Sequence, residues 1–401
     1  MLLLVTICFL LFLKDGCEAN EIEVGGSISH NLIYLLKENR LLENATYFKI
    51  FLEKYFFNHK GKFHLSFKGD YDSVQNKELI KLNEAYGDVY LKNIDLRMGR
   101  QIIRWGTADG INPTSFVTPP EFSFEESEPI VEPIACFRGT YYNRGTDVTA
   151  VIVFNNQFRA IPVEIEEELQ KSVHGEGNLL LLLEPAKTLN NMEYAFKIDT
   201  RLVNNDVRLS YFHGWEDYPA LWINNEFEVK SQYRRVNKVG LATAGIAGKG
   251  ALWSEVAYVI PEKIEEMNSA NTLFTMNKPY FQLILGIDYT FKEMYLEGQY
   301  IYYGNGSLIS PYFRFQRGEK VPAAHYFMVS SHNFNKIRNL RLDSIVNLGD
   351  QSYILIPQYG FYISEGVYLS LRGVLFFGNE KAEFGRLKDK ELVNLGVKIS
   401  F

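Results

Sequence analysis

Leu392-Val393-Asn394-Leu395-Gly396-Val397-Lys398-Ile399-Ser400-Phe401 closes the chain with alternating apolar and polar residues. Successive side chains of a β-strand point to opposite sides, so the last eight residues give one apolar and one polar face. The same period of two recurs at 63–67, 194–198, 281–289 and 367–377. Because it prevails along nearly the whole chain, the sequence predicts an all-β protein.

We predict eighteen strands from this alternation. They cover residues 22–36, 44–57, 62–71, 79–91, 94–105, 135–143, 146–155, 192–203, 206–213, 227–247, 250–260, 279–290, 293–303, 323–333, 337–348, 352–362, 366–377 and 391–401. The segment 227–247 is long enough to hide a bulge or an extra element. The apolar face of such strands points inward in a soluble sandwich and outward in a membrane barrel, so alternation alone does not separate these folds.

The connections between the strands do separate them. One alternate set contains the long connections: 37–43, 72–78, 106–134, 156–191, 214–226, 261–278, 304–322, 349–351 and 378–390. The other set is short throughout: 58–61, 92–93, 144–145, 204–205, 248–249, 291–292, 334–336 and 363–365. Outer-membrane barrels have short periplasmic turns and long extracellular loops, whereas a sandwich has no reason to sort its loops by parity. The sequence therefore predicts a transmembrane antiparallel β-barrel of about 18 strands, an even number with both termini on the short-turn side.

The first residues have the pattern of a secretory signal. An apolar run over 2–13 precedes Lys14, and Cys17-Glu18-Ala19 supplies a small-x-Ala cleavage site. We expect a signal peptide over 1–19 and a barrel over 20–401; lipid modification at Cys17 and an N-terminal core segment are the alternatives. Cleavage would leave Cys136 as the single cysteine, which excludes an intramolecular disulfide. A net charge of −6 argues against nucleic acid as a partner.

Two features carry a resemblance to known proteins. The terminal Phe401 resembles the signal that the barrel-assembly machinery reads in outer-membrane barrels. The stretch Leu96-Arg97-Met98-Gly99-Arg100-Gln101-Ile102-Ile103-Arg104-Trp105-Gly106, followed by Thr107-Ala108-Asp109-Gly110-Ile111-Asn112-Pro113, resembles a family of such barrels with a Gly-Arg-Gln…Trp-Gly segment, and less closely alginate-export porins. The segments 285–300 and 342–401 fit the pattern; 156–191 fits it least. The resemblance implies an outer-membrane barrel with a passage role, in monomeric form, and no particular substrate.

The loop 106–134 is the candidate for a constriction, because long loops of such barrels often fold into the lumen. We expect it to narrow the lumen together with Arg97, Gln101 and Arg104; the alternative is that Gly99, Trp105 and Asp109 only fix a tight strand–loop junction. Strict alternation places Arg97 and Gln101 in the lumen but Arg100 and Arg104 outside. A bulge near Gly99, or a place at the rim, would resolve that conflict.

Charged and polar residues of both signs are predicted to line the channel or its constriction. They are Glu84, Asp88, Arg97, Gln101, Arg104, Asp109, Arg138, Arg201, Arg208, Glu255, Asp288, Glu297, Arg341 and Arg372. A slight positive excess on the predicted lumen face indicates a pore that tolerates anions. Mutually neutralised ladders that only stabilise the wall are the alternative.

The predicted function is a porin-like outer-membrane channel for small or anionic hydrophilic solutes. The alternatives are a plugged structural or adhesive barrel acting through its loops, and a barrel hydrolase. The sequence lacks a metal-binding His-Glu-x-x-His pair and a Gly-x-Ser-x-Gly elbow, and His213 with Asp217 near Ser210 is the single cluster that suits hydrolysis. We therefore expect no enzyme activity, cofactor, metal or nucleic acid. The expected partners are outer-membrane lipid, lipopolysaccharide, the barrel-assembly machinery and a hydrophilic solute.

Overall fold

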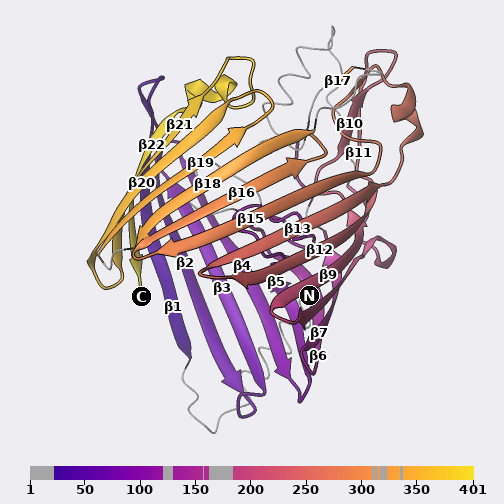
Figure 1. Cartoon of the computed structure of the whole chain (residues 1–401). Coiled ribbons are helices and arrows are strands. Elements are labelled where there is room, and N and C mark those ends of the chain that lie inside the picture. The colour runs from indigo at the N-terminus through magenta and orange to yellow at the C-terminus, as the bar shows by residue number, and fades with distance from the viewer. Residues whose placement is uncertain are drawn as a thin grey trace.

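The protein is described by a computed structural model over residues 22–120, 130–156, 158–161, 184–308, 312, 315–316, 323–334 and 337–401. Within these ranges eighteen strands form one antiparallel sheet. The sheet closes on itself because β1 (Glu23–Leu35) pairs with both β2 (Arg40–Phe56) and β22 (Leu392–Ser400). The chain is thus a closed 18-stranded β-barrel, as the alternation and loop lengths predicted (Figure 1).

The other barrel strands follow one another in chain order. They are β3 (Gly61–Asp72), β4 (Lys77–Tyr90), β5 (Ile94–Gln101), β6 (Ile134–Asn143), β7 (Thr146–Asn155), β8 (Glu193–Leu202), β9 (Asn205–Trp215), β12 (Arg235–Ala247), β13 (Gly250–Pro261), β15 (Tyr280–Phe291), β16 (Met294–Tyr303), β18 (Ala324–Phe334), β19 (Arg338–Asn347), β20 (Tyr353–Ser364) and β21 (Val367–Phe377). Short 3-10 helices occur at Leu189–Asn191, Glu265–Ser269 and Gly385–Lys390. Among the described residues no helix is both long and apolar enough to cross a membrane.

Connection length separates the two ends of the barrel. At the short-turn end every connection has two to four residues, as at 57–60, 144–145 and 248–249. At the long-loop end lie all the long connections, among them 102–133 and 156–192, together with a few short ones. The last strand ends at the short-turn end, where Phe401 exchanges two backbone hydrogen bonds with Gly26. The predicted parity of the loops is therefore confirmed.

Most predicted boundaries differ from the structure by a few residues, and three of the differences bear on the fold. The long segment 227–247 contains an extra element: β11 (Val229–Gln232) joins β10 (Ala220–Ile223), β14 (Thr272–Leu273) and β17 (Phe315–Gln316) in a small sheet built from the long loops. The predicted strand 94–105 stops at Gln101, where the chain leaves the wall. The hairpin predicted to turn at 204–205 turns one residue earlier, because Leu202 pairs directly with Asn205.

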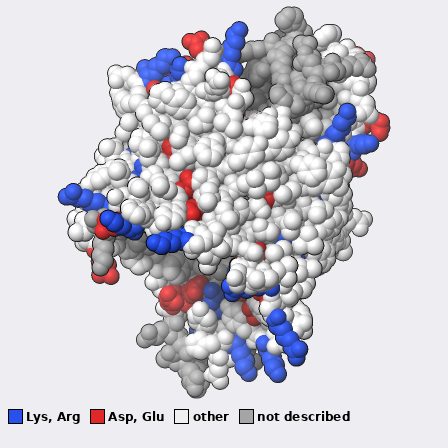
Figure 2. Space-filling model, in the orientation of Figure 1, with Lys and Arg blue, Asp and Glu red and all other residues white. Residues whose placement is uncertain are grey.

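The outer face of the barrel is apolar around its middle. Large hydrophobic side chains stand exposed on the strands, including Ile50, Phe196, Leu241, Leu285, Phe327 and Leu395. The face shown in Figure 2 carries Lys, Arg, Asp and Glu mainly at its two ends, with few between. Such a band, poor in charge and lying between two charged rims, is the surface expected of a barrel that sits in lipid.

The inner face is less polar than the sequence predicted. In the half toward the long loops, inward-facing residues such as Ile284, Ile301, Tyr326 and Ile354 form a buried apolar cluster. Phe384, from the last long loop, is fully buried in the same cluster. The prediction of a charged lumen face therefore holds for part of the wall only, because loops that fold inward need apolar wall residues to pack against.

Candidate functional site

The barrel interior holds a segment that leaves the end of β5 and returns to the wall. We call residues 102–118 the crossing segment. Its two ends meet, since Ile103 N donates to Thr118 Oγ1 at 3.0 Å and that hydroxyl donates back to Ile103 O at 2.5 Å. The base packs in a second apolar cluster in which Trp105 and Phe116 contact inward residues of β6 to β13. The segment is thus a closed loop that lies in the lumen.

Glu255 on β13 anchors the crossing segment. Its side chain is fully buried, and five donors of the segment converge on the carboxylate. Oε1 accepts from Thr107 N, Thr107 Oγ1 and Ala108 N, the last at 2.8 Å. Oε2 accepts from Thr114 N at 3.1 Å and Thr114 Oγ1 at 2.7 Å. Hydrogen bonds to a charged acceptor are stronger than those between neutral groups. This single side chain therefore holds both the outgoing and the returning half of the loop.

Gly106 is the residue that lets the segment approach Glu255. Its φ is +97°, in the left-handed region that favours glycine. A Cβ there would lie 2.7 Å from Glu255 Oε1 and 2.5 Å from Asn112 Oδ1. Arg208 on β9 donates from Nη1 to Gly106 O at 2.9 Å and pairs with Asp199 at 3.0 Å. The glycine of the Trp105-Gly106 pair therefore allows the crossing segment to lie close against the barrel wall.

The tip of the segment reaches the opposite side of the interior. Gln299 on β16 donates to Asp109 O at 3.1 Å, while Ala108 and Ile111 pack into the apolar cluster of the far wall. Partial burial raises the pKa of the Asp109 carboxyl; nearby Arg341 lowers it by less, and Asp288 adds to the rise. Contacts with β9, β13 and β16 thus tie the segment across the lumen.

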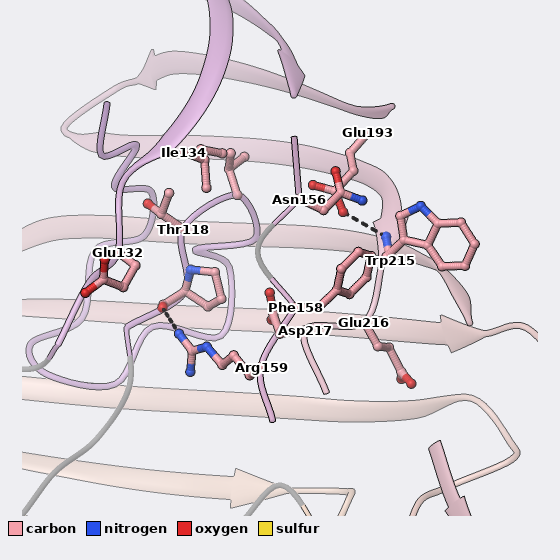
Figure 3. A pocket seen from close by; sticks show the side chains of 12 residues that line it. Thr118, Glu132, Ile134, Asn156, Phe158, Arg159, Glu193, Trp215, Glu216 and Asp217 are labelled. Atoms are coloured by element: carbon pink, nitrogen blue, oxygen red, sulfur yellow. Dashed lines mark hydrogen bonds between the residues drawn. The ribbon is translucent and has the colours of Figure 1, made fainter. Parts of the chain in front are cut away.

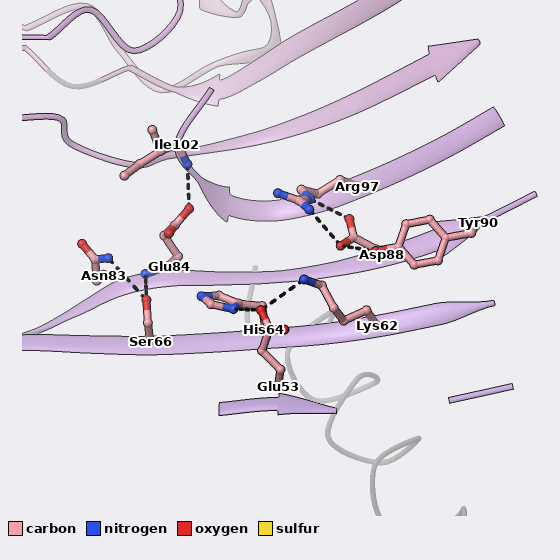
Figure 4. A network of polar contacts seen from close by, with 10 residues as sticks. All are labelled: Glu53, Lys62, His64, Ser66, Asn83, Glu84, Asp88, Tyr90, Arg97 and Ile102. Carbon is pink, nitrogen blue, oxygen red and sulfur yellow. Dashed lines mark hydrogen bonds and ion pairs between the residues drawn. The ribbon is translucent and has the colours of Figure 1, made fainter. Parts of the chain in front are cut away.

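A polar network on β2 to β5 forms the wall where the segment begins (Figure 4). Arg97 and Asp88 form a two-pronged ion pair at 2.6 and 2.9 Å, and the Arg97 guanidinium lies 3.8 Å from the centre of the Tyr86 ring. Glu84 accepts from Ile102 N at 2.9 Å and so fixes the first residue of the segment. Glu53 accepts from His64 at 2.7 Å, with Lys62 at 3.1 Å. These charges neutralise one another within the wall.

The two arginines that strict alternation places outside are accommodated in different ways. Gly99 has φ +139°, but β5 pairs with β4 and β6 without a register shift, and the bulge lies in β4, opposite Ser66 and Phe67 of β3. Arg104 lies beyond the end of β5, in the crossing segment. Arg100 donates to Asn83 O at 3.0 Å and lies 3.7 Å from Glu132. Burial would raise the pKa of Glu132, but Lys68 and Lys81 outweigh it and lower the pKa. Residues 121–129 of the predicted constriction loop 106–134 lie outside the described residues.

Gln101 and Arg138 occupy the inner wall next to this network. Gln101 is fully buried and donates to Cys136 O at 3.3 Å. Arg138 is the cross-strand neighbour of Arg97 in the β5–β6 register. Both residues lie in the barrel wall beside the base of the crossing segment, and neither contacts its tip in the described structure.

A polar cavity of about 400 Å³ lies inside the barrel at the short-turn end. The crossing segment supplies Arg104, Trp105 and Gly106 to its lining. The charged lining residues are Arg104, Lys197, Arg201 and Arg208 against Asp147, Asp199 and Asp206. Asp199 pairs with both Lys197, at 2.8 Å, and Arg208. Arg104 and Arg201 form no ion pair with any described residue, so the cavity keeps a slight positive excess.

The remaining predicted lining residues stand on the far wall. Asp288 accepts from Ala251 N at 2.9 Å, and the Tyr295 hydroxyl reaches both Asp288, at 3.3 Å, and Glu297, at 3.4 Å. Arg341 pairs with Asp343 at 2.7 Å. Arg372 on β21 is buried opposite Gln358. The fold therefore brings Asp288, Glu297 and Arg341 near the tip of the crossing segment but leaves Arg372 elsewhere on the wall.

Two pockets open on the other side of the crossing segment, toward the long loops. The smaller, of about 30 Å³, is drawn in Figure 3: Arg159 donates to Pro119 O at 3.4 Å and Trp215 N donates to Glu193 at 2.9 Å. The larger, of about 160 Å³, is lined by polar and aromatic residues. These are Glu216, Asp217, Tyr218, Arg234, Lys238, Thr275, Met276, Tyr280 and Asn305.

The last long loop closes part of the mouth. Glu383 accepts from Tyr326, Asn347 and Ser307, each at 2.7 Å. Burial would raise the pKa of Asp350, but donors from Glu383 and Ser352 outweigh it and hold the pKa low. Sequence reasoning missed this loop, and it missed Gln299 and the threonines that face Glu255. Their signal was weak, because single polar residues are also common in solvated loops and on the lumen face of a strand.

The one cluster considered for hydrolysis is not assembled. Ser210 and His213 lie three positions apart in β9, whose pairing with β8 and β12 has no register shift, so they point to opposite faces. His213 Nδ1 lies 2.9 Å from Asn237 Oδ1.

Comparison with known proteins shows likeness in structure and none in sequence. No family model and no curated protein matches the chain. Among solved structures, OccK11 (OpdR) of Pseudomonas aeruginosa is similar with a TM-score of 0.55 and 10% identity, over 95% of this chain and 96% of that one. A mutant porin of Rh. blastica has a TM-score of 0.45 and 11% identity, over 95% and 100%. The first likeness shows the fold; the second, below 0.5, adds nothing to it. The resemblance to Gly-Arg-Gln…Trp-Gly barrels and alginate-export porins stays a prediction.

Proposed function

We propose that this protein is a porin-like outer-membrane channel for small hydrophilic solutes, with its lumen narrowed by the crossing segment. The observation that carries the proposal is the five-donor anchor on Glu255, which holds a polar loop inside a closed barrel with an apolar outer belt. Polar cavities on both sides of this loop supply space for a hydrophilic solute. The first test is single-channel conductance of the refolded protein in a planar bilayer.

The chain is proposed to reach the membrane by a signal peptide over 1–19, which lies outside the described residues. Its long loops would face the outside and contact lipopolysaccharide, and its short turns would face the periplasm. Phe401 would be read by the barrel-assembly machinery, and the barrel would act as a monomer. The apolar belt on its strands supports a location in lipid.

A plugged barrel that acts through its outer loops is the second candidate. The buried apolar cluster that joins Phe384 to the wall favours it, since apolar packing excludes water from that part of the interior. Stable conductance in the bilayer would contradict a plugged barrel. A silent bilayer with confirmed insertion would contradict the open channel.

Arginine residues without an ion pair are proposed to set the preference for anions. Replacing both Arg104 and Arg201 with glutamate would change the charged lining of the short-turn cavity from four cations and three carboxylates to two and five. Rings of charge select ions of opposite sign, so we expect the reversal potential in a salt gradient to change sign toward cations. Lys292→Glu, in an exposed turn, is the control. An unchanged reversal potential in the double variant would remove this cavity from the ion path.

Low pH is expected to favour the docked state of the crossing segment, in which the segment is held against the barrel wall. The pKa of Asp109 is raised in the docked segment, so docking binds a proton and is favoured at low pH. As pH rises from the ordinary aspartate value of about 3.9 through the raised pKa, docking weakens, and it levels off above that pKa. We expect conductance to increase over this window and Asp109→Asn to flatten the increase. A variant with the full pH response of the wild type would show that another group is responsible.

A further inference from the structure

The larger pocket on the long-loop side has the chemistry of a binding site, and nothing in the proposed channel function requires one there. Its volume of about 160 Å³ is ample for a small solute, since one water needs only about 10–15 Å³ of such space. The pocket combines two cationic groups, Arg234 and Lys238, with two carboxylates, Glu216 and Asp217. The charges therefore balance: Arg234 and Glu216 form an ion pair, and Lys238 and Asp217 supply one further charge of each sign.

Arg234 is the buried member of this group. Its side chain is 2% exposed, and it donates to Glu216 at 2.6 and 3.1 Å and to Met276 O at 2.7 Å. Its Nη1 has no partner among the described residues. Because Nη1 is itself enclosed by protein, Arg234 contributes its positive charge to the pocket and not a donor that a ligand can reach. A buried positive charge favours a ligand group of opposite sign, such as a carboxylate.

Lys238 and Asp217 supply the second pair of charges. The Lys238 ammonium lies 5.2 Å from the centre of the Phe212 ring and 5.8 Å from that of Phe116, and it forms no ion pair with any described residue. The Asp217 carboxylate likewise has no ion-pair partner in the described part of the chain; its backbone oxygen accepts from Arg159 N at 2.8 Å. Figure 3 shows Asp217 beside Phe158 and Arg159, where the two pockets share this residue.

We propose that this pocket binds a small zwitterion with one carboxylate and one ammonium group, of the size of an amino acid. Its carboxylate meets Lys238, close to the positive charge of the buried Arg234, and its ammonium meets Asp217. A ligand with both charges leaves no net charge in the pocket, whereas an ion of either sign adds one that the protein does not balance. Since Phe116 belongs to the crossing segment, the zwitterion is held just before the constriction. This last step rests on the proposed channel function; binding itself does not.

The test measures equilibrium binding to the full-length protein in detergent by titration calorimetry. L-alanine is the zwitterion, and propionate and ethylammonium are its single-charge counterparts with the same carbon chain. We expect alanine to bind about tenfold or more tightly than either. Asp217→Asn weakens alanine about 10- to 100-fold and leaves propionate unchanged, while Lys238→Met weakens both. Lys249→Met, in an exposed turn, is the matched control, and circular dichroism confirms folding of each variant.

The proposal is overturned if propionate binds as tightly as alanine, or if both variants bind alanine with the affinity of the wild type. Absence of alanine binding in the folded wild type would overturn it as well. The outcome is independent of the bilayer experiment. Binding with a silent bilayer would contradict the channel and leave the site standing; conductance without binding would contradict the site alone.

Discussion

Glu255→Ala is expected to release the crossing segment and raise single-channel conductance severalfold. The substitution leaves three backbone N–H groups and two threonine hydroxyls without the carboxylate that accepts from them. A buried hydrogen bond to a charged group contributes about 1.5–3 kcal/mol, so losing the group of five costs the docked state more than about 3 kcal/mol. A change of that size shifts the ratio of docked to released segment by more than about 100-fold.

Planar-bilayer recording checks this expectation. Glu255→Gln keeps one acceptor oxygen and turns the other side into a donor, so we expect it to fall between wild type and alanine. Glu293→Ala removes an exposed carboxylate from a nearby turn and should behave like the wild type. If Glu255→Ala folds normally by circular dichroism but conducts like the wild type, the crossing segment does not limit the pore.

Leu285→Arg is expected to lower the free energy of unfolding in phospholipid vesicles by about 2–4 kcal/mol, the cost of a cation at mid-depth on the lipid face of a barrel. Leu285 stands exposed in the middle of β15, with Tyr300 as its cross-strand neighbour. In a water-soluble protein the same change at an exposed site would be nearly neutral. The size of the loss in unfolding free energy therefore shows whether lipid or water surrounds the outer face.

Phe291→Arg is the matched control, because Phe291 is exposed on the same face of β15 as Leu285 but lies next to the turn 292–293. At that depth we expect a cost of about 0–1 kcal/mol. Equilibrium unfolding by urea in vesicles gives both values. Equal costs at the two sites would contradict a lipid belt centred on the middle of the strands.

The sequence alone did not predict the conformation of the long loops. The strand 94–105 looked continuous because Ile102 and Ile103 extend the apolar pattern, yet the chain leaves the wall at Gln101. Two carboxylates hold it in the interior. Glu84 accepts from Ile102 N, 18 positions away in the sequence. Glu255 accepts from donors in residues 107–114, and it lies 148 positions from Thr107. A contact at such separation leaves no local pattern in the sequence.

By itself the sequence determined the barrel. Alternation with period two fixed the strands and their apolar face, and the parity of the loop lengths gave the closed architecture with its two unlike ends, because backbone pairing and lipid contact act strand by strand. Only the tertiary structure decided which inward residues touch a loop and which line open space. Ile284 and Asp288 lie on the same face of one strand, yet one packs in an apolar cluster and the other belongs to the polar wall. Alternation assigns a residue to a face; what that face meets depends on segments folded in from elsewhere in the chain.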